Sequence, residues 1–266
     1  IGGGVTVLPG VTIGSRTFVY SYIGEEMHWI YGRDYVRAPK GSTYTDENGT
    51  VIDCSGMPII DPKTGYPSLI EDPNQRIAKV NPDWKAGFGT SVRYKNLSFS
   101  AQFTAQVGGN SFSVTNFALS YQGKLKNSLP GREDGLVLKG VNAVDNGDGT
   151  ISYRKNNTIT ENVYIYYNKY QWVRDNTKAN TFSTDFLKLK EVRLDYRFSE
   201  RWMQKTKFLR SASIGIFATN LFCITNWPQY DPEAAGVVSG TNIYGGIETG
   251  SFPMTRTYGF NIKLQF

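Results

Sequence analysis

The sequence contains one histidine, His28, and only two cysteines, Cys54 and Cys223. A single histidine excludes multi-histidine metal sites and relays between histidines, and we do not expect a Ser-His-Asp triad. Two cysteines this far apart, without the neighbouring ligands of a zinc site, indicate neither a disulfide framework nor a metal centre. Phosphate-binding loops, dinucleotide-binding fingerprints and nucleophile elbows are also absent from the sequence. We therefore expect a protein that is not an enzyme and that has no cofactor.

Long apolar runs and sustained helical periods are also missing. The uncharged stretch 211–230 has the length of a membrane helix, but polar residues recur through it and Pro228 interrupts it. The first residues, IGGGVTVLPG, lack the basic and apolar regions of a signal peptide. We expect no membrane-spanning helix, and we expect the first residue to be a cut rather than a natural beginning.

The chain has a net positive charge, but its basic residues are scattered along the sequence. The net charge of +6 comes from 29 basic and 23 acidic residues, and the basic residues form no run. Nucleic acid is therefore not an expected partner. The Asp-rich segment that starts at Asp46 resembles a calcium loop, but Val51 and Met57 stand where the turn glycine and the closing acid belong. That segment and the one starting at Asp145 are interpreted as turns.

Aromatic residues and glycine are abundant, with 17 Tyr, 15 Phe and 28 Gly. This composition is typical of an all-β protein with many turns. In the last segment every second residue is apolar, namely Tyr258, Phe260, Ile262, Leu264 and Phe266. A period of two predicts a strand with one apolar face and one polar face.

The same alternation occurs upstream. In residues 186–198 Val192, Leu194 and Tyr196 share one face, and charged residues occupy the other. Residues 88–107 change parity at Lys95–Asn96, which predicts a hairpin with a two-residue loop. Weaker strand signals cover 16–24 and 211–222, and short helices within connections are expected at 113–125 and 162–175.

Short and long connections alternate between the expected strands. Lys95–Asn96 and 199–207 are short, whereas 108–184 and 223–253 are long. Outer-membrane barrels have short periplasmic turns and long outer loops, while a soluble sandwich has no reason to sort its connections by length. A half-exposed strand of a soluble sheet explains any one of these strands but not all four. The pattern favours a barrel whose apolar faces meet lipid and whose polar faces meet a wet interior.

Four segments carry a resemblance to a known family: NPDWKAGFGTSVRYKNLSFSAQFTAQVGGNSF, FLKLKEVRLDYRFS, ATNLFCITNWPQYDPE and FPMTRTYGFNIKLQF. Their order, spacing and terminal position closely resemble the carboxy-terminal part of SusC/RagA-family TonB-dependent outer-membrane transporters. They cover most of the chain from Asn81 to Phe266. YGRDYVRAPKG and GMPIIDPKTGYP resemble the loop before them.

The resemblance implies an all-β fold, the C-terminal portion of a large antiparallel transmembrane β-barrel of about 22 strands with long extracellular loops. Residues 1–266 would form its last third, and the plug domain would be absent from this chain. The implied function is TonB-dependent import of a nutrient, an oligosaccharide or a peptide, across the bacterial outer membrane. The implied partners are a SusD-like surface lipoprotein, outer-membrane lipid, and TonB through the missing N-terminal part.

Several residues are candidates for ligand or lid contact. Tyr166, Tyr167 and Trp172 belong to an aromatic cluster in the longest connection, and such rings stack on sugar faces or peptide side chains. The alternative is that these rings pack the loop onto the barrel rim or onto a lid protein. Asp231, in the segment YDPE, is expected to accept backbone hydrogen bonds, with ligand contact as its alternative role. The terminal strand, with Phe266 at its end, resembles the signal that barrel-assembly machinery reads.

Two other functions stay open at this point. One is a siderophore or vitamin receptor of the same architecture, and the other is a structural or adhesive outer-membrane barrel. The charged face with Glu191, Arg193, Asp195 and Arg197 suits a plug-filled barrel better than a narrow adhesin. If Cys54 and Cys223 both lie near the outer rim, they could form a disulfide.

Overall fold

The computed structural model describes residues 7–13, 17–171, 176–206, 208–234, 245–250 and 252–266. The chain divides into two compact units. The first, the sheet unit, comprises residues 81–110, 182–235 and 251–266. The second, the loop unit, comprises residues 1–80, 111–181 and 236–250. The loop unit therefore contains most of the long connection 108–184 and part of the long connection 223–253.

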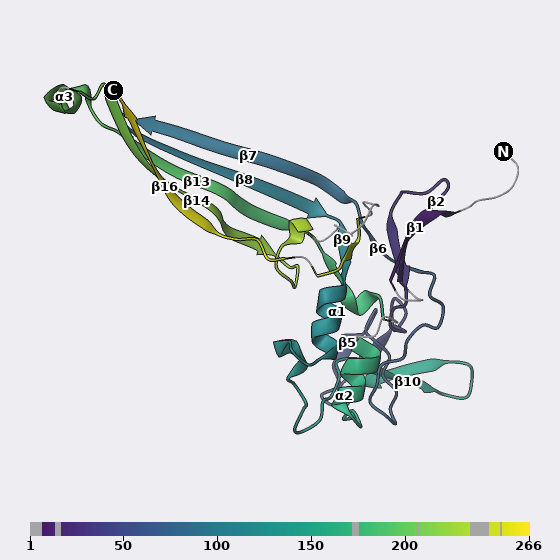
Figure 1. Cartoon of the computed structure of the whole chain (residues 1–266). Coiled ribbons are helices and arrows are strands. Elements are labelled where there is room, and N and C mark those ends of the chain that lie inside the picture. Colours follow the sequence, from purple (N-terminus) through teal and green to yellow (C-terminus); the bar gives the residue numbers. More distant parts are fainter. Residues whose placement is uncertain (1–6, 14–16, 172–175, 207, 235–244, 251) are drawn as a thin grey trace, which may run out of the picture. The chain divides into compact units, whose positions relative to one another are not determined.

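The sheet unit is built on one antiparallel sheet of five long strands, which run side by side in Figure 1. Their order is β16-β14-β13-β8-β7. The bounds are Pro82–Tyr94 for β7, Leu97–Gly108 for β8, Phe186–Arg197 for β13, Ser211–Thr225 for β14 and Thr257–Gln265 for β16. The stretch 211–230, too polar for a membrane helix, thus forms a strand through most of its length. All four strand segments predicted for this part of the chain are confirmed.

The strand register aligns the apolar residues of all five strands on one face. Tyr94 is opposite Leu97, and the same row continues through Tyr196, Ile214 and Ile262. The next row joins Val92, Phe99, Leu194, Ile216 and Phe260. These side chains are largely uncovered; Phe260, for example, is 73% exposed. A continuous exposed apolar face is what a sheet surrounded by lipid requires.

A β-bulge keeps the apolar face continuous along β13. The register shifts between Leu189 and Glu191 toward both neighbouring strands. Toward β8 the extra residue is Lys190, whereas toward β14 two residues lie between Thr219 and Phe222, so the extra residue there belongs to β14. Leu189 pairs with Phe103 and Val192 pairs with Ala101, which lie on the same face of β8. Strict alternation would have put Leu189 and Val192 on opposite faces, and the extra residue corrects this.

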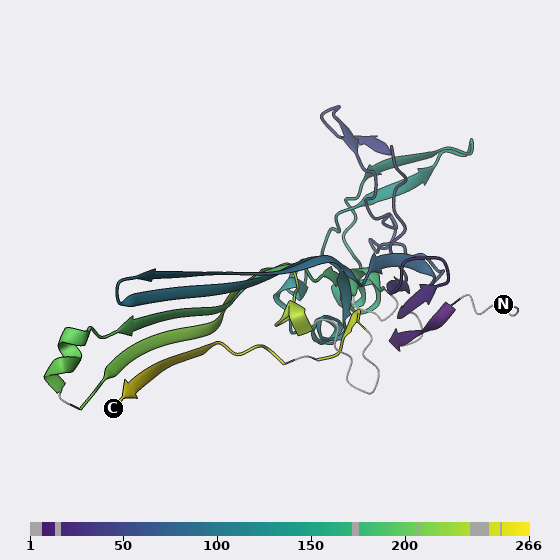
Figure 2. The same cartoon turned by 90° about the horizontal axis from the view of Figure 1, so that it is seen from above.

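The short connections lie at one end of the sheet and the long ones at the other. Lys95–Asn96 joins β7 to β8, and the connection from β13 to β14 holds the helices α3, Glu200–Met203, and η4, Gln204–Thr206. Figures 1 and 2 show α3 and the C-terminus at the same end of the strands. There Phe208 stacks on Phe266 with ring centroids 6.3 Å apart. The predicted alternation of connection lengths is confirmed.

The loop unit contains short strands and helices in place of a single large sheet. Four strands form a sheet of order β1-β2-β3-β6, and two hairpins, β4-β5 and β10-β11, are clear in Figure 2. The strand bounds are Val7–Ile13 for β1, Thr17–Tyr22 for β2, Trp29–Gly32 for β3, Thr43–Thr45 for β4, Val51–Asp53 for β5, Gln75–Lys79 for β6, Val141–Asp145 for β10 and Ile151–Lys155 for β11. Strands β9, Asn110–Ser113, and β15, Ile247–Glu248, pair in parallel. Strand β12 spans Thr181–Ser183, at the boundary between the two units.

The helices of the loop unit occur where short helices are expected from the sequence. Helix α1 spans Val114–Tyr121, and α2, Val163–Ile165, continues into the π-helix η2, Tyr166–Gln171. The side chain of Ser113 caps the first turn of α1 by accepting a hydrogen bond from the backbone N–H of Asn116. Two further short helices of the loop unit are η1, Lys126–Ser128, and η3, Lys178–Asn180, whereas η5, Pro232–Ala234, belongs to the sheet unit. Among the helices of the described residues, none is long and apolar enough to cross a membrane.

A small apolar core joins three distant segments of the loop unit. Val19 and Ile30 pack with Phe112 and Ile247, and each of these side chains is at most 1% exposed. Buried amides supplement this core: Asn116 donates to Asn180 at 3.1 Å, and Asn142 donates to Asn156 at 3.2 Å. Because few apolar side chains are available, hydrogen-bonded asparagines hold the loops together.

The structure shows a turn at Asp46, and it locates both cysteines. Asp46 accepts the backbone N–H groups of Asn48 and Thr50 in the β4-β5 hairpin, which confirms a turn. No group of acidic, histidine and cysteine side chains in the described part of the chain is arranged to hold a metal ion. Cys54 is buried in the loop unit, Cys223 lies on β14 of the sheet unit, and both are free thiols.

Candidate functional site

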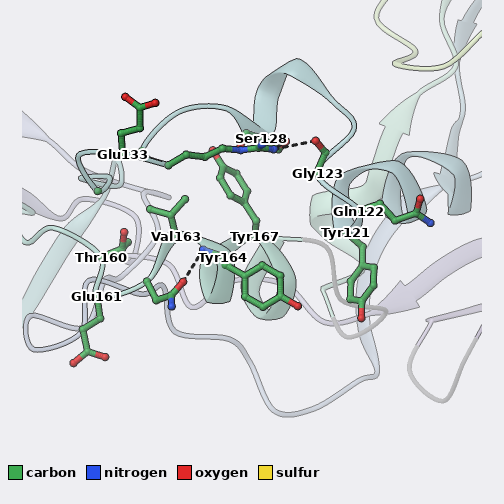
Figure 3. Close-up of a pocket in the computed structure, with 14 residues that line it drawn as sticks. Tyr121, Gln122, Gly123, Ser128, Glu133, Thr160, Glu161, Val163, Tyr164 and Tyr167 are labelled. Atoms are coloured by element: carbon green, nitrogen blue, oxygen red, sulfur yellow. Dashed lines mark hydrogen bonds between the residues drawn. The ribbon is translucent and has the colours of Figure 1, made fainter.

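A cavity of about 560 Å³ opens in the loop unit between the end of α1 and the start of α2 (Figure 3). Its volume lies in the range of small-molecule sites. Its lining comes from two segments, 121–135 and 160–167, both within the longest connection. Its residues are Tyr121, Gln122, Gly123, Ser128, Gly131, Arg132, Glu133, Gly135, Thr160, Glu161, Asn162, Val163, Tyr164 and Tyr167. We call this the loop cavity.

The aromatic rings of the loop cavity differ in exposure. Tyr164 is 66% exposed and Tyr121 is 49% exposed, and Figure 3 shows both rings beside the opening. Tyr167 is 8% exposed, and its hydroxyl donates toward the carbonyl oxygens of Asn127 and Pro130 at 3.1 and 3.2 Å. Tyr167 is therefore anchored, while Tyr121 and Tyr164 are available to stack on a ligand.

Tyr166 lies beside Tyr167, with ring centroids 5.0 Å apart. Burial, and next the neighbouring phenol of Tyr167, raise the pKa of Tyr166 to about 12. Both phenols therefore stay neutral at physiological pH, and they pack around the buried Val163. Trp172, the third aromatic residue of the predicted set, lies outside the described residues.

Polar groups surround the cavity. Arg132 donates to the carbonyl oxygens of Ser128 and Gly123, at 2.8 and 2.9 Å, and so closes the 123–132 turn. Glu133 and Glu161 lie at separate edges in Figure 3. The hydroxyl of Thr160 is buried and has no hydrogen-bond partner among the described residues. The walls thus offer hydrogen-bond acceptors, a set suited to a polyhydroxyl or amide ligand that donates to them.

The sequence pointed to only part of this cavity. It singled out the aromatic cluster after Asn162 and a short helix within 113–125, but nothing in it indicates that the two segments meet. Tyr121 was not singled out because its helix was interpreted as part of a connection. A Tyr at the end of a predicted loop helix is the only signal that could have drawn attention to it.

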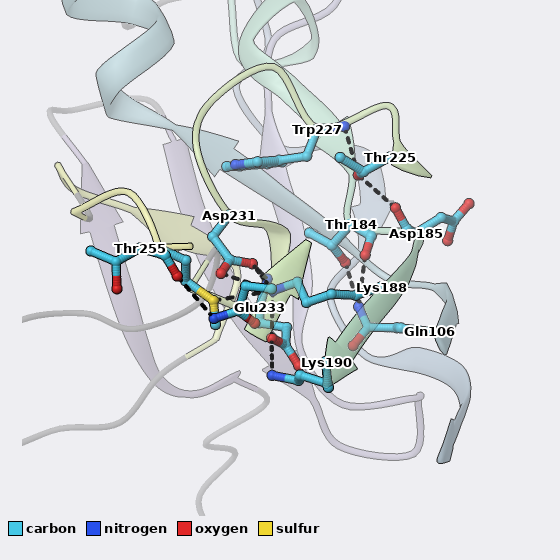
Figure 4. A network of polar contacts seen from close by, with 12 residues as sticks. Gln106, Thr184, Asp185, Lys188, Lys190, Thr225, Trp227, Asp231, Glu233 and Thr255 are labelled. Carbon is cyan, nitrogen blue, oxygen red and sulfur yellow. Dashed lines mark hydrogen bonds and ion pairs between the residues drawn. The ribbon is translucent and has the colours of Figure 1, made fainter. Parts of the chain in front are cut away.

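A second cluster, the lysine–carboxylate network, lies in the sheet unit (Figure 4). The ammonium of Lys188 on β13 donates to both carboxylate oxygens of Asp231, at 2.7 and 2.9 Å, and to Glu233 at 2.6 Å. Lys190 donates to the same oxygen of Glu233 at 2.6 Å. Two ammonium groups and two carboxylates therefore balance in charge. A buried lysine is stable as a cation only with such partners.

Asp231 is 4% exposed, and Lys188 is 2% exposed. One oxygen of Asp231 also accepts the backbone N–H of Glu233 at 3.0 Å, so the predicted backbone hydrogen bond is present. Burial by itself would raise the pKa of Glu233, but the hydrogen bonds from Lys188 and Lys190 outweigh it and lower that pKa. The network fixes the start of the last long connection to the polar face of β13.

No protein-family profile matches the sequence. The chain is 25% identical over 252 residues to the TonB-dependent receptor P3 of Formosa agariphila, which covers 91% of this chain and 22% of that receptor. The chain is SusC/RagA-like. The predicted resemblance to TonB-dependent outer-membrane transporters and the predicted location in the bacterial outer membrane are confirmed.

Solved structures agree on the fold. The structure of the RagAB peptide importer in its open-open state matches 97% of this SusC/RagA-like chain and 27% of the importer chain, with a TM-score of 0.51 and 19% identity. The closed-closed state gives a TM-score of 0.50 and 18% identity over 97% of this chain and 28% of that one. The all-β fold class is confirmed, and the five-stranded sheet is a stretch of barrel wall. The chain spans about a fifth to a quarter of the lengths of these relatives, none of which is an enzyme by name.

Proposed function

We propose that this chain forms part of the wall and outer loops of a TonB-dependent transporter that imports a nutrient, an oligosaccharide or a peptide. The observation that carries the proposal is the similarity to a TonB-dependent receptor over 91% of the chain. The sheet supports it, because one face is apolar and the other carries polar and charged residues such as Arg193, Asp195 and Asn261. In this proposal residues 1–266 belong to the C-terminal part of a barrel of about 22 strands, and a plug domain lies outside them.

The proposed partners are a SusD-like lipoprotein at the cell surface and TonB in the periplasm. A peptide as the nutrient is supported by the likeness to a peptide importer, whereas the exposed tyrosines of the loop cavity suit a sugar ring equally well. In this proposal the loops capture the ligand, and the plug moves to let it pass.

Gene deletion tests the proposed import. A strain without the whole gene should fail to grow on the one oligosaccharide or peptide mixture that the transporter takes up, and the intact gene should restore growth. Uptake should also stop when TonB is deleted or the proton-motive force is collapsed, whereas a porin would still conduct. Unchanged growth on every candidate oligosaccharide and peptide, with no redundant paralogue in the genome, would contradict nutrient import.

Aromatic substitutions test ligand capture. The predicted contacts are Tyr166, Tyr167 and Trp172, and the exposed pair of the loop cavity is Tyr121 and Tyr164. Replacing the exposed pair with Ala should weaken binding by about 1 to 3 kcal/mol for each ring that stacks on the ligand, as rings do on nucleobases. Tyr167→Ala should instead destabilise the loop unit, because its ring belongs to a buried cluster. Titration calorimetry on the whole receptor, with thermal unfolding as the control, separates the two effects.

A further inference from the structure

A second, smaller cavity in the loop unit contains a buried arginine. The cavity has a volume of about 310 Å³ and shares no lining residue with the loop cavity. Arg33 follows β3 directly, and its side chain is 10% exposed. The wall opposite the charge is aromatic and apolar: the rings of Tyr66 and Tyr170 are stacked with centroids 4.9 Å apart, and Pro67 and Leu69 complete it. We call this the arginine cavity.

The buried guanidinium has an exposed counter-ion. Nη2 of Arg33 donates to Oε2 of Glu71 at 2.9 Å, and the side chain of Glu71 is 89% exposed. An ion pair with one partner this exposed contributes little, because solvent competes for the carboxylate and the free side chain keeps its rotamers. Glu71 can therefore leave the guanidinium at small cost.

The same edge of the guanidinium has a donor to spare. Nε of Arg33 is buried and has no hydrogen-bond partner among the residues that the structure describes. Nε and Nη2 point the same way and form a two-donor edge that matches the two oxygens of a carboxylate. Glu71 uses one donor of this edge, whereas an incoming carboxylate would use both. A buried donor without an acceptor is costly, so two-point binding has an advantage over the existing contact.

Asp61 limits which anions fit. Asp61 also lines the arginine cavity, and its two oxygens accept hydrogen bonds from the backbone N–H of Lys63 and the hydroxyl of Thr64. It is therefore held in its own turn, and its negative charge repels ligands that carry several charges. The small volume admits one terminal unit of a longer chain.

We propose that the arginine cavity binds the single carboxylate at the end of a nutrient chain, with Glu71 as a displaceable counter-ion. The carboxylate is either the C-terminus of a peptide or the acid group of a uronic-acid sugar, since both present the same two oxygens. Its biological meaning rests on the proposed import function, but binding can be measured without transport.

The test is titration calorimetry on the purified whole receptor with two matched pairs of probes. One pair is an N-acetylated tripeptide with a free C-terminus and the same tripeptide as its amide. The other is a galactose trisaccharide whose terminal unit alone is galacturonic acid, and the neutral galactose trisaccharide. The acid of one pair should bind about ten-fold or more tightly than its neutral partner, and that pair identifies the source of the carboxylate.

Variants of the two charged residues complete the test. Arg33→Lys keeps the charge but removes the two-donor edge, so it should remove most of the preference for the acid. Glu71→Gln should strengthen binding of the acid by a few-fold, because the competing carboxylate is gone. Glu47→Gln, an exposed glutamate in the β4-β5 hairpin, is the matched control and should change nothing.

Equal affinity for both members of each pair, or no binding of any of the four probes, would overturn the proposal. A preference for the acid that survives in Arg33→Lys and is unchanged in Glu71→Gln would also overturn it, because the preference would then come from elsewhere. Growth of the same variants on the imported nutrient reports on the import function separately. Loss of growth in the gene deletion together with no preference for the acid would reject this inference alone.

Discussion

Lys188 shows how much a single residue of the barrel wall can contribute. It occupies the polar face of β13, and its ammonium is nearly inaccessible to solvent but in contact with two carboxylates. Lys190 is two residues away and donates to the same Glu233, yet its side chain is 32% exposed. The two lysines are therefore matched in chemistry and differ in burial.

We predict that Lys188→Met lowers the free energy of unfolding by about 3 to 5 kcal/mol, because it leaves the buried carboxylate of Asp231 without a cation. Lys190→Met should cost about 1 kcal/mol or less, since an exposed pair is screened by solvent. Urea unfolding of the whole receptor in detergent micelles measures both. Equal costs for the two variants would mean that the network is solvated in the membrane-embedded protein.

The lowered pKa of Glu233 predicts how stability depends on pH. A carboxyl whose pKa is lower in the folded state stabilises the fold above its unfolded pKa, about 4.3 for Glu. This contribution should be complete at pH 7 and should be lost as the pH falls below about 4 through the folded pKa. Glu233→Gln removes the titrating group, so the difference in unfolding free energy between wild type and variant should shrink over that acid range. A difference that stays constant down to the folded pKa would contradict the assignment.

At the scale of the element, the terminal strand β16 has two faces with different surroundings. Ile262 is 58% exposed on the apolar face and lies opposite Ile214. Its neighbour Asn261 faces the other way and pairs with Gly215 of β14, which in turn pairs with Asp195 of β13. The sheet therefore provides an internal comparison of a lipid position with an interior position.

We predict that Ile262→Arg costs about 2 to 4 kcal/mol if the residue lies near the membrane midplane, because a charge there has to be placed in hydrocarbon. Asn261→Arg should cost less, since the new charge faces a polar interior and an acidic neighbour. Folding yield and urea unfolding in lipid vesicles measure the two variants. If Asn261→Arg were the more damaging change, the faces of the strand would be assigned the wrong way round.

At the scale of the whole molecule, the sorting of connections by length makes a prediction about topology. Protease added to intact cells should cut within 109–183 or 224–250 unless a lid protein covers them. It should spare Lys95 and 199–207, which are on the periplasmic side in this assignment. Mass spectrometry of the released fragments identifies the sites, and lysed cells provide the control in which all segments are accessible. Cuts restricted to the two short connections would invert the assignment.

The sequence by itself determined the strands and their faces. Alternation with a period of two is a local property, and lipid on one side makes it strict, so residues 88–107 and 258–266 could be assigned without any partner strand. The Lys95–Asn96 turn was equally clear, because a two-residue hairpin requires a change of parity. The turns at Asp46 and Asp145 follow from side chains that bond to their own backbone.

Only the tertiary structure decided what the long connections do. Their contacts are made between residues far apart in the sequence: Phe112 packs with Val19 and Ile247, and Lys188 pairs with Asp231. The sequence gives no periodic signal for such pairings. Loops that are held together by asparagine amides and a few apolar side chains have no repeating pattern of apolar residues. The bulge at Lys190 was invisible for a related reason, since the sequence shows a change of parity but not which residue is left over. Tyr121 is exposed and Tyr167 is anchored, although both are tyrosines, and Arg33 is buried although most arginines are exposed. In each case the burial is decided by residues from other segments of the chain.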